Sequence, residues 1–219
     1  MFKKTTEEKV LRDPVHGYIH VELQVVWDVI NSSWFQRLRR IRQLGGAYVV
    51  YHCAEHSRFG HSLGVYELVR RMVSEVQDIS NALNEREKVT AMLAGLLHDI
   101  GHGPYSHAFE GVTKTSHEEF TCRIIEENTE ITRILEDCCE GLSKDVADVI
   151  RHESSNPLLS QLISSQLDAD RFDYLLRDAY FTGTKYGEYD LERILRTMRV
   201  HDGKQLVIKE SGVYAVENY

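Results

Sequence analysis

Apolar residues recur with helical spacing along most of this 219-residue chain. Between residues 61 and 76, the side chains of Leu63, Tyr66, Val69 and Val73 recur every three or four positions, so they share one face of an α-helix. The chain is therefore predicted to be mainly α-helical. Comparable patterns predict further helices over residues 34–44, 85–99, 116–127, 129–138, 143–151, 157–163, 168–180 and 190–197.

Glycine-rich breaks and short extended segments separate these helices. Gly45 and Gly46 end the helix over 34–44, and the sequence GHGP at 101–104 ends the helix over 85–99. Ser116 has an acidic residue three positions later, the spacing of a capping box at a helix start. Extended structure is predicted at 18–21, and a brief strand or turn at 48–51. Strand-like runs around an Asp-Gly pair predict a small β-hairpin over 198–208, near the C-terminus.

The composition is that of an ordinary globular protein. Hydrophobic residues make up 42% and charged residues 27% of the chain. No apolar run is long enough to span a bilayer, and the N-terminus lacks the apolar stretch of a signal peptide. The four cysteines lack metal-binding spacing and are interpreted as reduced thiols. A cytoplasmic protein with no membrane association is therefore expected.

The charge distribution limits the possible ligands. The net charge of −8 argues against strong nucleic-acid binding, which needs an extended positive surface. It leaves room for a small phosphate substrate bound by a local arginine cluster. The run Arg37, Arg39, Arg40 and Arg42 is either such a cluster or a solvated helix face. Because the chain has no P-loop and no dinucleotide-binding glycine motif, a metal and side chains would have to bind the phosphates.

The pair His98-Asp99 directly follows an apolar helical run, Val89 to Leu97. Polar side chains beside a core helix cost free energy unless something compensates them, and a divalent metal would do so. The alternative is a solvated helix end with no ligand. A mononuclear site needs three or four ligands from separate elements and an open position. The predicted ligand set is His61, His98, Asp99 and Asp170.

Five ordered sequence blocks extend this prediction. The blocks are RDPVHGYI (12–19), FQRLRRIRQLG (35–45), HSRFGHSLG (56–64), LHDIGHGPYSH (97–107) and DADRFDYLLRD (168–178). With them the chain resembles the HD-domain superfamily of metal phosphohydrolases, in the branch of the deoxynucleoside triphosphate triphosphohydrolases. The resemblance implies an HD-domain helical bundle, a single domain over 1–219 with its core at about 11–190. Relatives continue beyond this length, so a C-terminal truncation is expected.

The resemblance implies hydrolysis of a deoxynucleoside triphosphate to deoxynucleoside and inorganic triphosphate. One divalent transition metal (Mn, Fe, Zn, Ni or Co) would activate water, and Mg could arrive with the triphosphate. The departing 5′ alkoxide needs a proton, and an imidazolium is suited to supply it. The resemblance assigns this role to His117 or His107, with Glu110 paired to His117 and His102 on phosphate. In the alternative, each histidine is a loop residue with a backbone hydrogen bond.

The same resemblance implies the substrate contacts. Arg58 and Arg171 would bind phosphate oxygens, although many relatives have Lys at the second position. Tyr174 would flank the sugar and exclude ribonucleotides. Asp178 and Gln43 would bind the 3′-hydroxyl, and Leu44 belongs to the same substrate-binding set. In the alternative, Tyr174 and Asp178 only pack against and cap their helix.

A nucleotide effector and an oligomer are also implied. Relatives are often dimers or tetramers that bind an effector such as dGTP at a subunit interface. The corresponding effector-binding residues are Asn31, Gln36 and Arg39, and Asn31 stands where some relatives carry an acidic residue. Two other functions stay open: a different HD-type phosphodiesterase or phosphomonoesterase, or a catalytically incomplete nucleotide-binding or assembly module.

Overall fold

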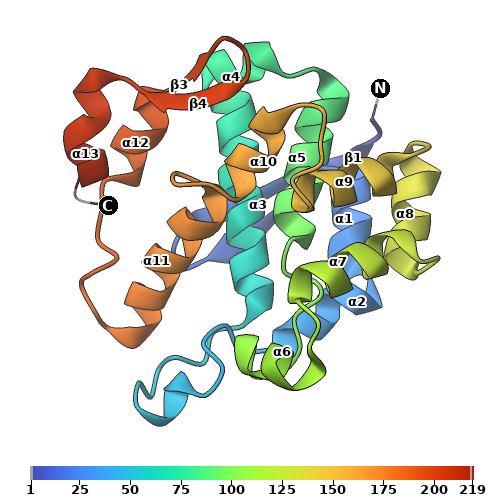
Figure 1. Cartoon of the computed structure of the whole chain (residues 1–219), viewed down its shortest axis with the longest axis vertical. Helices are drawn as coiled ribbons and strands as arrows, with labels where there is room; N and C mark the ends of the chain where they lie inside the picture. Colours follow the sequence, from blue (N-terminus) through green and yellow to red (C-terminus); the bar gives the residue numbers. More distant parts are fainter. Residues whose placement is uncertain (1, 218) are drawn as a thin grey trace.

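Helices account for most of the chain, with one two-stranded sheet near each end (Figure 1). The computed structural model describes residues 2–217 and 219. This confirms the predicted mainly α fold and its C-terminal hairpin. The elements are β1 (Lys4–Asp13), β2 (Gly17–Leu23), α1 (Gln24–Asn31), α2 (Ser33–Arg37), η1 (Leu38–Arg40), η2 (Ala47–Val49), α3 (Arg58–Glu75), α4 (Gln77–Ala82), α5 (Glu85–Leu97), α6 (His107–Thr113), α7 (His117–Glu126), α8 (Glu130–Cys138), α9 (Leu142–Ile150), α10 (Pro157–Ile163), α11 (Ala169–Thr182), α12 (Leu191–Thr197), β3 (Met198–His201), β4 (Gln205–Ile208), η3 (Glu210–Gly212) and α13 (Val213–Glu217).

Helix α3 runs through the middle of the fold, between α5 and α11 (Figure 1). Its side chains from Phe59 to Val69 are almost all buried, because neighbouring helices cover it on several sides. Helix α5 is apolar from Val89 to Leu97 and packs against α3, α9 and α10. The apolar run identified in the sequence is therefore a core helix.

Helix α5 begins at the residue that the sequence predicts and ends two residues earlier than predicted. The Asn84 side chain accepts a hydrogen bond from the Glu87 amide, and the Glu87 carboxylate accepts one from the Asn84 amide, which completes a capping box. The helix ends at Leu97, with His98 as its C-cap. Because the N-terminus is fixed by the cap and the middle by the core, the His98-Asp99 pair has a defined position at the end of a rigid element.

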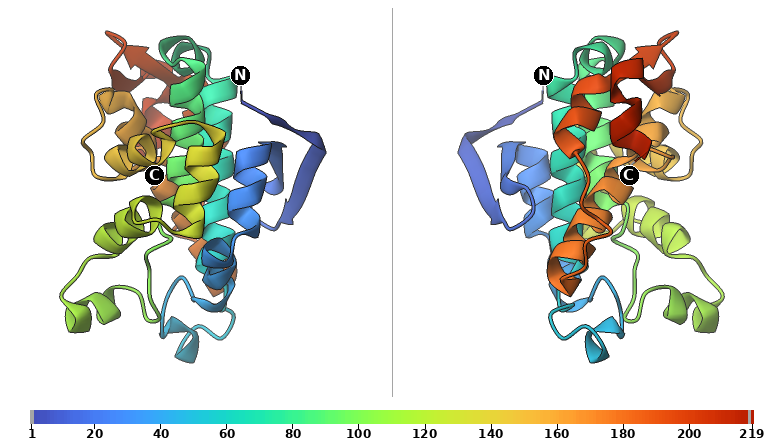
Figure 2. Two further views of the ribbon diagram at one scale, coloured as in Figure 1. Left: turned by 90° about the vertical axis from the view of Figure 1, so that its right-hand side faces the viewer. Right: turned by 90° about the vertical axis from the view of Figure 1, so that its left-hand side faces the viewer.

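The N-terminal sheet is larger than predicted. Strands β1 and β2 form an antiparallel hairpin, whereas only residues 18–21 were expected to be extended. Strand β1 is missed by the hydrophobic pattern because most of its residues are polar and exposed. The Asp13 side chain accepts hydrogen bonds from the amides of Val15 and His16, each at 2.9 Å, and these close the turn. Helix α1 also went unpredicted, and it lies between this hairpin and α3 (Figure 2).

The predicted helix over 34–44 is wrong in its second half. Helix α2 ends at Arg37, and a 3₁₀ turn ends at Arg40. Residues 41–43 then pair with residues 56–58: the Arg58 amide donates to the Ile41 carbonyl at 2.9 Å, and the Gln43 amide donates to the His56 carbonyl at 3.0 Å. This pairing between distant segments overrides local helical periodicity. At 48–51 the structure has a 3₁₀ helix and a turn, and helices α4 and α6 were not predicted.

The C-terminal hairpin confirms its Asp-Gly signal. Strands β3 and β4 are antiparallel, and Asp202 and Gly203 have φ angles of 50° and 70°. Both residues thus adopt the left-handed conformation that tight hairpin turns require. Among residues 2–217 and 219, no helix combines the length and apolarity needed to cross a membrane.

Candidate metal centre

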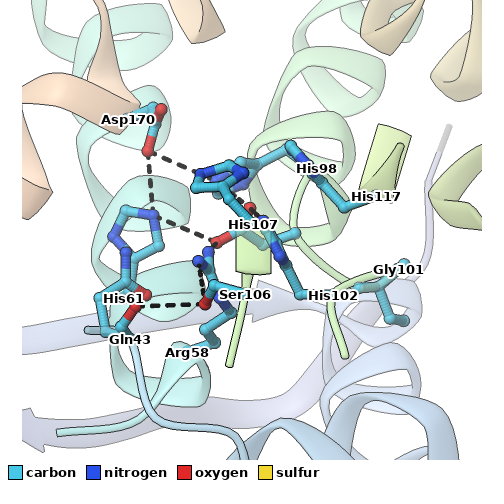
Figure 3. Close-up of polar contacts among 12 residues, drawn as sticks. Gln43, Arg58, His61, His98, Gly101, His102, Ser106, His107, His117 and Asp170 are labelled. Atoms are coloured by element: carbon cyan, nitrogen blue, oxygen red, sulfur yellow. Dashed lines mark hydrogen bonds and ion pairs between the residues drawn. The ribbon is translucent and has the colours of Figure 1, made fainter. Parts of the chain in front are cut away.

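Three helix ends converge at one point of the fold (Figure 3). His61 lies in the first turn of α3, and His98 and Asp99 directly follow the last residue of α5. Asp170 lies in the first turn of α11, whose start is fixed because Asp168 accepts a hydrogen bond from the Arg171 amide at 2.6 Å. Three separated segments therefore bring the four predicted ligands together.

The potential ligand atoms have the spacing of a metal site. The distances from His61 Nε2 to Asp170 Oδ1 and to Asp99 Oδ2 are 2.9 and 3.5 Å. His98 Nε2 lies 3.5 Å from both Asp99 Oδ1 and Asp170 Oδ1. Ligands about 2.1 Å from one ion lie about 3.0–3.4 Å from one another, so this separation fits a common ion.

The tautomers of both histidines also fit a metal. His61 Nδ1 donates to Asp173 Oδ2 at 2.7 Å, and His98 Nδ1 donates to the Gly95 carbonyl at 2.8 Å. Each ring therefore presents an Nε2 lone pair. Both Nε2 atoms are buried and face the Asp170 carboxylate, but neither makes a contact with hydrogen-bond geometry among the described residues. Because buried polar atoms are normally satisfied, this pair of unpartnered nitrogens fits a divalent cation.

The electrostatics show an excess of negative charge. Burial alone would raise the pKa of Asp99, but the charges of His98 and Arg58 hold it well below its usual range. Burial lowers the pKa of His61, but Asp170 and Asp173 outweigh burial and raise it to about 10. Carboxylates that raise the pKa of a neighbouring histidine in this way also attract a divalent cation, which would displace the proton from the ligand nitrogen.

Arg58, predicted to bind phosphate, forms an ion pair with the proposed ligand Asp99. Its second terminal nitrogen donates to Ser106 Oγ at 2.8 Å, and its Nε has no partner among the described residues. Ser106 and its neighbour Tyr105 both have positive φ angles, of 52° and 64°. Non-glycine residues in this conformation are strained, and such strain is concentrated at functional sites.

His102, His107 and His117 lie beside the proposed ligands (Figure 3), and Glu110 contacts two of them. The rings of His102 and His117 stack with centroids 3.8 Å apart, and His102 Nε2 lies 3.2 Å from Asp99 Oδ1. His117 Nδ1 donates to Glu110 Oε1 at 2.6 Å, so the expected pairing is present. His107 Nδ1 lies 3.3 Å from the same oxygen, but its side chain is 72% exposed. His117 is therefore the better oriented of the two predicted acids.

Acidification is expected to destabilise the metal-free protein through His102. Burial lowers the pKa of His102 to about 4, below the 6.5 of an exposed histidine, although Asp99 opposes the shift. The folded state binds this proton less readily than the unfolded state. The contribution of His102 to the free energy of unfolding is therefore complete above pH 6.5 and is lost as the pH falls toward 4. The loss is at most about 1.4 kcal/mol per pH unit.

Urea unfolding of chelator-treated protein at several pH values measures this effect. We expect His102→Gln to flatten the dependence between pH 6.5 and 4. His201→Gln, at an exposed position on β3, should keep the wild-type slope. An equal fall in the free energy of unfolding in wild type and His102→Gln would show that His102 is not the group responsible. Asp99 and Asp170, whose pKa values are lowered, would lose their contribution only at lower pH.

The predicted substrate residues surround this centre at different depths. Asp178 is buried, and its Oδ1 accepts a hydrogen bond from His56 Nε2 at 2.7 Å. Arg171 and Tyr174 are partly exposed on α11. The main-chain carbonyl of Gln43 accepts a hydrogen bond from Ser106 Oγ at 3.4 Å, and Leu44 lies in the same turn. Buried polar atoms without a partner among the described residues include Gln43 Oε1 and Arg171 Nε.

The predicted effector residues lie around the junction of α1 and α2. Asn31 donates to the Trp27 carbonyl at 2.7 Å. Gln36 donates to the Ile30 carbonyl at 2.7 Å and accepts from Arg39 Nε at 2.7 Å, while the Arg39 guanidinium covers the Phe59 ring. Three arginines of this run, Arg37, Arg39 and Arg42, thus have separate partners. Arg37 donates to the carbonyls of residues 100 and 102, and Arg42 pairs with Glu55.

Several residues of the site were quoted in the sequence blocks without a role. Asp173 contacts His61, and His56 contacts Asp178. Their position inside the five sequence blocks is the one sequence signal that could have identified them. His16, Arg177 and Asp13 complete the contacts of Asp173.

A small pocket of about 80 Å³ opens on the centre. Its lining includes His98, Asp99, His117 and Asp170. A larger pocket of about 150 Å³, lined by residues such as Asn84 and Asp145, contains none of the predicted site residues. The smaller pocket therefore contains three of the predicted metal ligands and one of the predicted acids.

Comparison with known proteins agrees with this geometry. The HD-domain family model matches residues 58–178, more than half of the chain. The chain therefore belongs to the HD-domain family. This confirms the resemblance drawn from the sequence blocks. The matched segment contains all four predicted metal ligands.

The relatives include proteins with and without a stated activity. The chain is 54% identical over 216 residues to the uncharacterized protein YwfO of Bacillus subtilis, covering 99% of this chain and 50% of that protein. It is 32% identical over 227 residues to the human deoxynucleoside triphosphate triphosphohydrolase SAMHD1, covering 88% of this chain and 36% of that protein. A crystal structure of a phosphohydrolase from Bacteroides thetaiotaomicron superposes with a TM-score of 0.86 at 36% identity, covering 97% of this chain and 51% of that one. The chain thus spans about half, or less, of these proteins.

Proposed function

We propose that this protein hydrolyses deoxynucleoside triphosphates to deoxynucleoside and inorganic triphosphate. The observation that carries the proposal is the pair of buried, unpartnered Nε2 atoms of His61 and His98, which lie beside two carboxylates and the His117–Glu110 pair. The similarity to SAMHD1, whose name states this activity, supports the choice of substrate.

His61, His98, Asp99 and Asp170 would hold one divalent ion, with Mn, Fe, Zn, Ni and Co all compatible with the donor set. When bound, such an ion polarises a phosphate and lowers the pKa of water, and Mg could accompany the triphosphate. The protein's own task is to fix the ligands. The tautomer contacts of His61 and His98 and the capped helix ends serve this task.

Cleavage between the α-phosphorus and the 5′ oxygen produces an alkoxide, which is a poor leaving group without a proton. His117 would hold that proton at Nε2, because its Nδ1 already donates to Glu110. The Glu110 carboxylate fixes the orientation of the His117 ring. His102, stacked on His117, would contact phosphate, and the exposed His107 would act as a secondary donor.

The substrate would extend from the metal centre along α11. Arg58 and Arg171 would bind phosphate oxygens through their planar guanidinium groups. Tyr174 would flank the sugar at its 2′ carbon and exclude ribonucleotides. Asp178, oriented by His56, would bind the 3′-hydroxyl. Gln43 and Leu44 would complete this side of the pocket.

Regulation by a nucleotide and assembly into a dimer or tetramer are further parts of the proposal. A dGTP-type effector would contact Asn31, Gln36 and Arg39 at the α1–α2 junction. The resemblance to oligomeric relatives supports this part. A cytoplasmic location would suit a nucleotide substrate.

Product analysis tests the reaction. The purified chain is incubated with Mn²⁺ or Mg²⁺ and each of the four deoxynucleoside triphosphates, with and without dGTP, and the products are separated by chromatography. Deoxynucleoside plus intact triphosphate is the expected result. Monophosphate or orthophosphate would instead indicate a different phosphoesterase. Nucleotide binding without any product, in folded and metal-loaded protein, would indicate a non-catalytic binding module.

A further inference from the structure

Asp173 lies directly behind the proposed metal centre and is completely buried. Both of its oxygens are fully used. Oδ2 accepts from His61 Nδ1 at 2.7 Å and from Arg177 Nε at 2.8 Å. Oδ1 accepts from His16 Nε2 at 2.6 Å and from Arg177 Nη2 at 2.8 Å. A carboxylate has about four acceptor positions, so this network leaves Asp173 with one orientation.

The groups around Asp173 are themselves fixed. Arg177 donates to both oxygens of Asp13, at 2.9 and 3.3 Å, and Asp13 closes the turn of the N-terminal hairpin. Helix α3 approaches so closely at Gly64 that an added Cβ would lie 1.8 Å from Asp173 Oδ1. The carboxylate is thus enclosed by three elements: the hairpin, α3 and α11.

We infer that Asp173 is the positioning residue of the metal centre, which it serves by fixing the tautomer and the ring orientation of His61. This inference rests on the proposed metal site. A ring whose Nδ1 is held by a carboxylate must present Nε2 to the ion, and the negative charge increases the basicity of that nitrogen. His16 and Arg177 act one step further out, because they prevent the carboxylate from rotating away from His61.

The two histidine ligands differ in how they are held. His98 is oriented by the main-chain carbonyl of Gly95, which no side-chain substitution removes. His61 is oriented by a side chain, so its support can be removed by mutation. Asp173 therefore offers a way to disturb the geometry of one ligand without changing any ligand.

The test is the affinity of the metal-free full chain for Mn²⁺, measured by isothermal titration calorimetry. Asp173→Asn keeps the size of the side chain but removes its charge and half of its acceptor capacity. We expect the Kd to rise by about 10–100-fold, the usual effect of losing such a partner. Asp13→Asn is the matched control, because it removes a carboxylate from the same network without touching His61. Its Kd should stay within about threefold of wild type.

The outcomes separate this inference from the metal site itself. Wild-type affinity in Asp173→Asn would overturn the positioning role while leaving the metal site intact. Equal losses in Asp173→Asn and Asp13→Asn would also overturn it, since they would show that the network only stabilises the fold. No Mn²⁺ binding by wild type would refute the metal site, and the inference with it. Thermal unfolding of each metal-free variant shows whether it is folded.

A second variant decides the question if Asp173→Asn does not fold. His16→Ala removes one hydrogen bond to Asp173 but keeps the carboxylate and its contact with Arg177. We expect a smaller rise in Kd, of at least about threefold. An unchanged Kd in folded His16→Ala would then overturn the inference.

Discussion

Replacing Asp99 with alanine is expected to abolish hydrolysis, lowering kcat by about 10³-fold or more. The two oxygens of Asp99 face different partners. Oδ2 faces His61 and Arg58, and Oδ1 faces His98 and His102. The substitution therefore removes a proposed ligand and also the carboxylate partner of Arg58. Losing a group that supports a metal ligand usually lowers metal affinity or activity by about 10–100-fold. Losing the ligand itself should lower them more.

The experiment compares deoxynucleoside release and bound metal in wild type and Asp99→Ala. Asp137→Ala, at an exposed position on α8, is the control and should keep full activity. Removing one partner of a buried ion pair costs about 3–5 kcal/mol, so circular dichroism must first show that Asp99→Ala is folded. Asp99→Asn, which keeps the volume, serves as the second variant. Folded variants that retain both metal and turnover would refute the role of Asp99.

Replacing His117 with glutamine is expected to lower kcat by about 10²–10⁴-fold, the usual contribution of a general acid. The variant should still bind metal, because His117 is not among the four proposed ligands. Glu110→Gln should reduce kcat less, since it weakens the pair but leaves the imidazole in place. Steady-state kinetics with a deoxynucleoside triphosphate measures both effects.

The leaving group distinguishes proton donation from a structural role of His117. In p-nitrophenyl triphosphate, the departing phenolate is stable without a proton. His117→Gln should therefore hydrolyse this ester at nearly the wild-type rate while remaining defective on the nucleotide. An equal defect on both substrates would show that His117 acts through binding or structure rather than as the acid.

The four proposed ligands could be singled out from residue type and flanking sequence. His98 and Asp99 follow an apolar helical run, and His61 and Asp170 lie in the sequence blocks that resemble the family. The supporting network could not be predicted in the same way. His16 and Asp173 are 157 positions apart, and Arg177 and Asp13 are 164 apart. No periodicity relates residues at such separations, and only the folded chain shows that they meet.

The errors in the fold have a similar cause. Helical periodicity continues through residues 38–44, but the pairing of 41–43 with 56–58 is more favourable than another helical turn. Strand β1 carries mostly polar residues and owes its extended form to pairing with β2. Helices with their own caps, such as α5 and α11, were predicted closely because their end signals are local.

Because of the N-terminal hairpin, the segment needed to form the proposed metal site is longer than the family match. The family match begins at residue 58 and contains every proposed ligand. His16, which donates a hydrogen bond to Asp173, lies more than forty positions earlier. A fragment cut to the borders of the family match would keep the ligands and lose part of the frame that aims one of them. Sequence exchanges between relatives should accordingly transfer His16 together with α11.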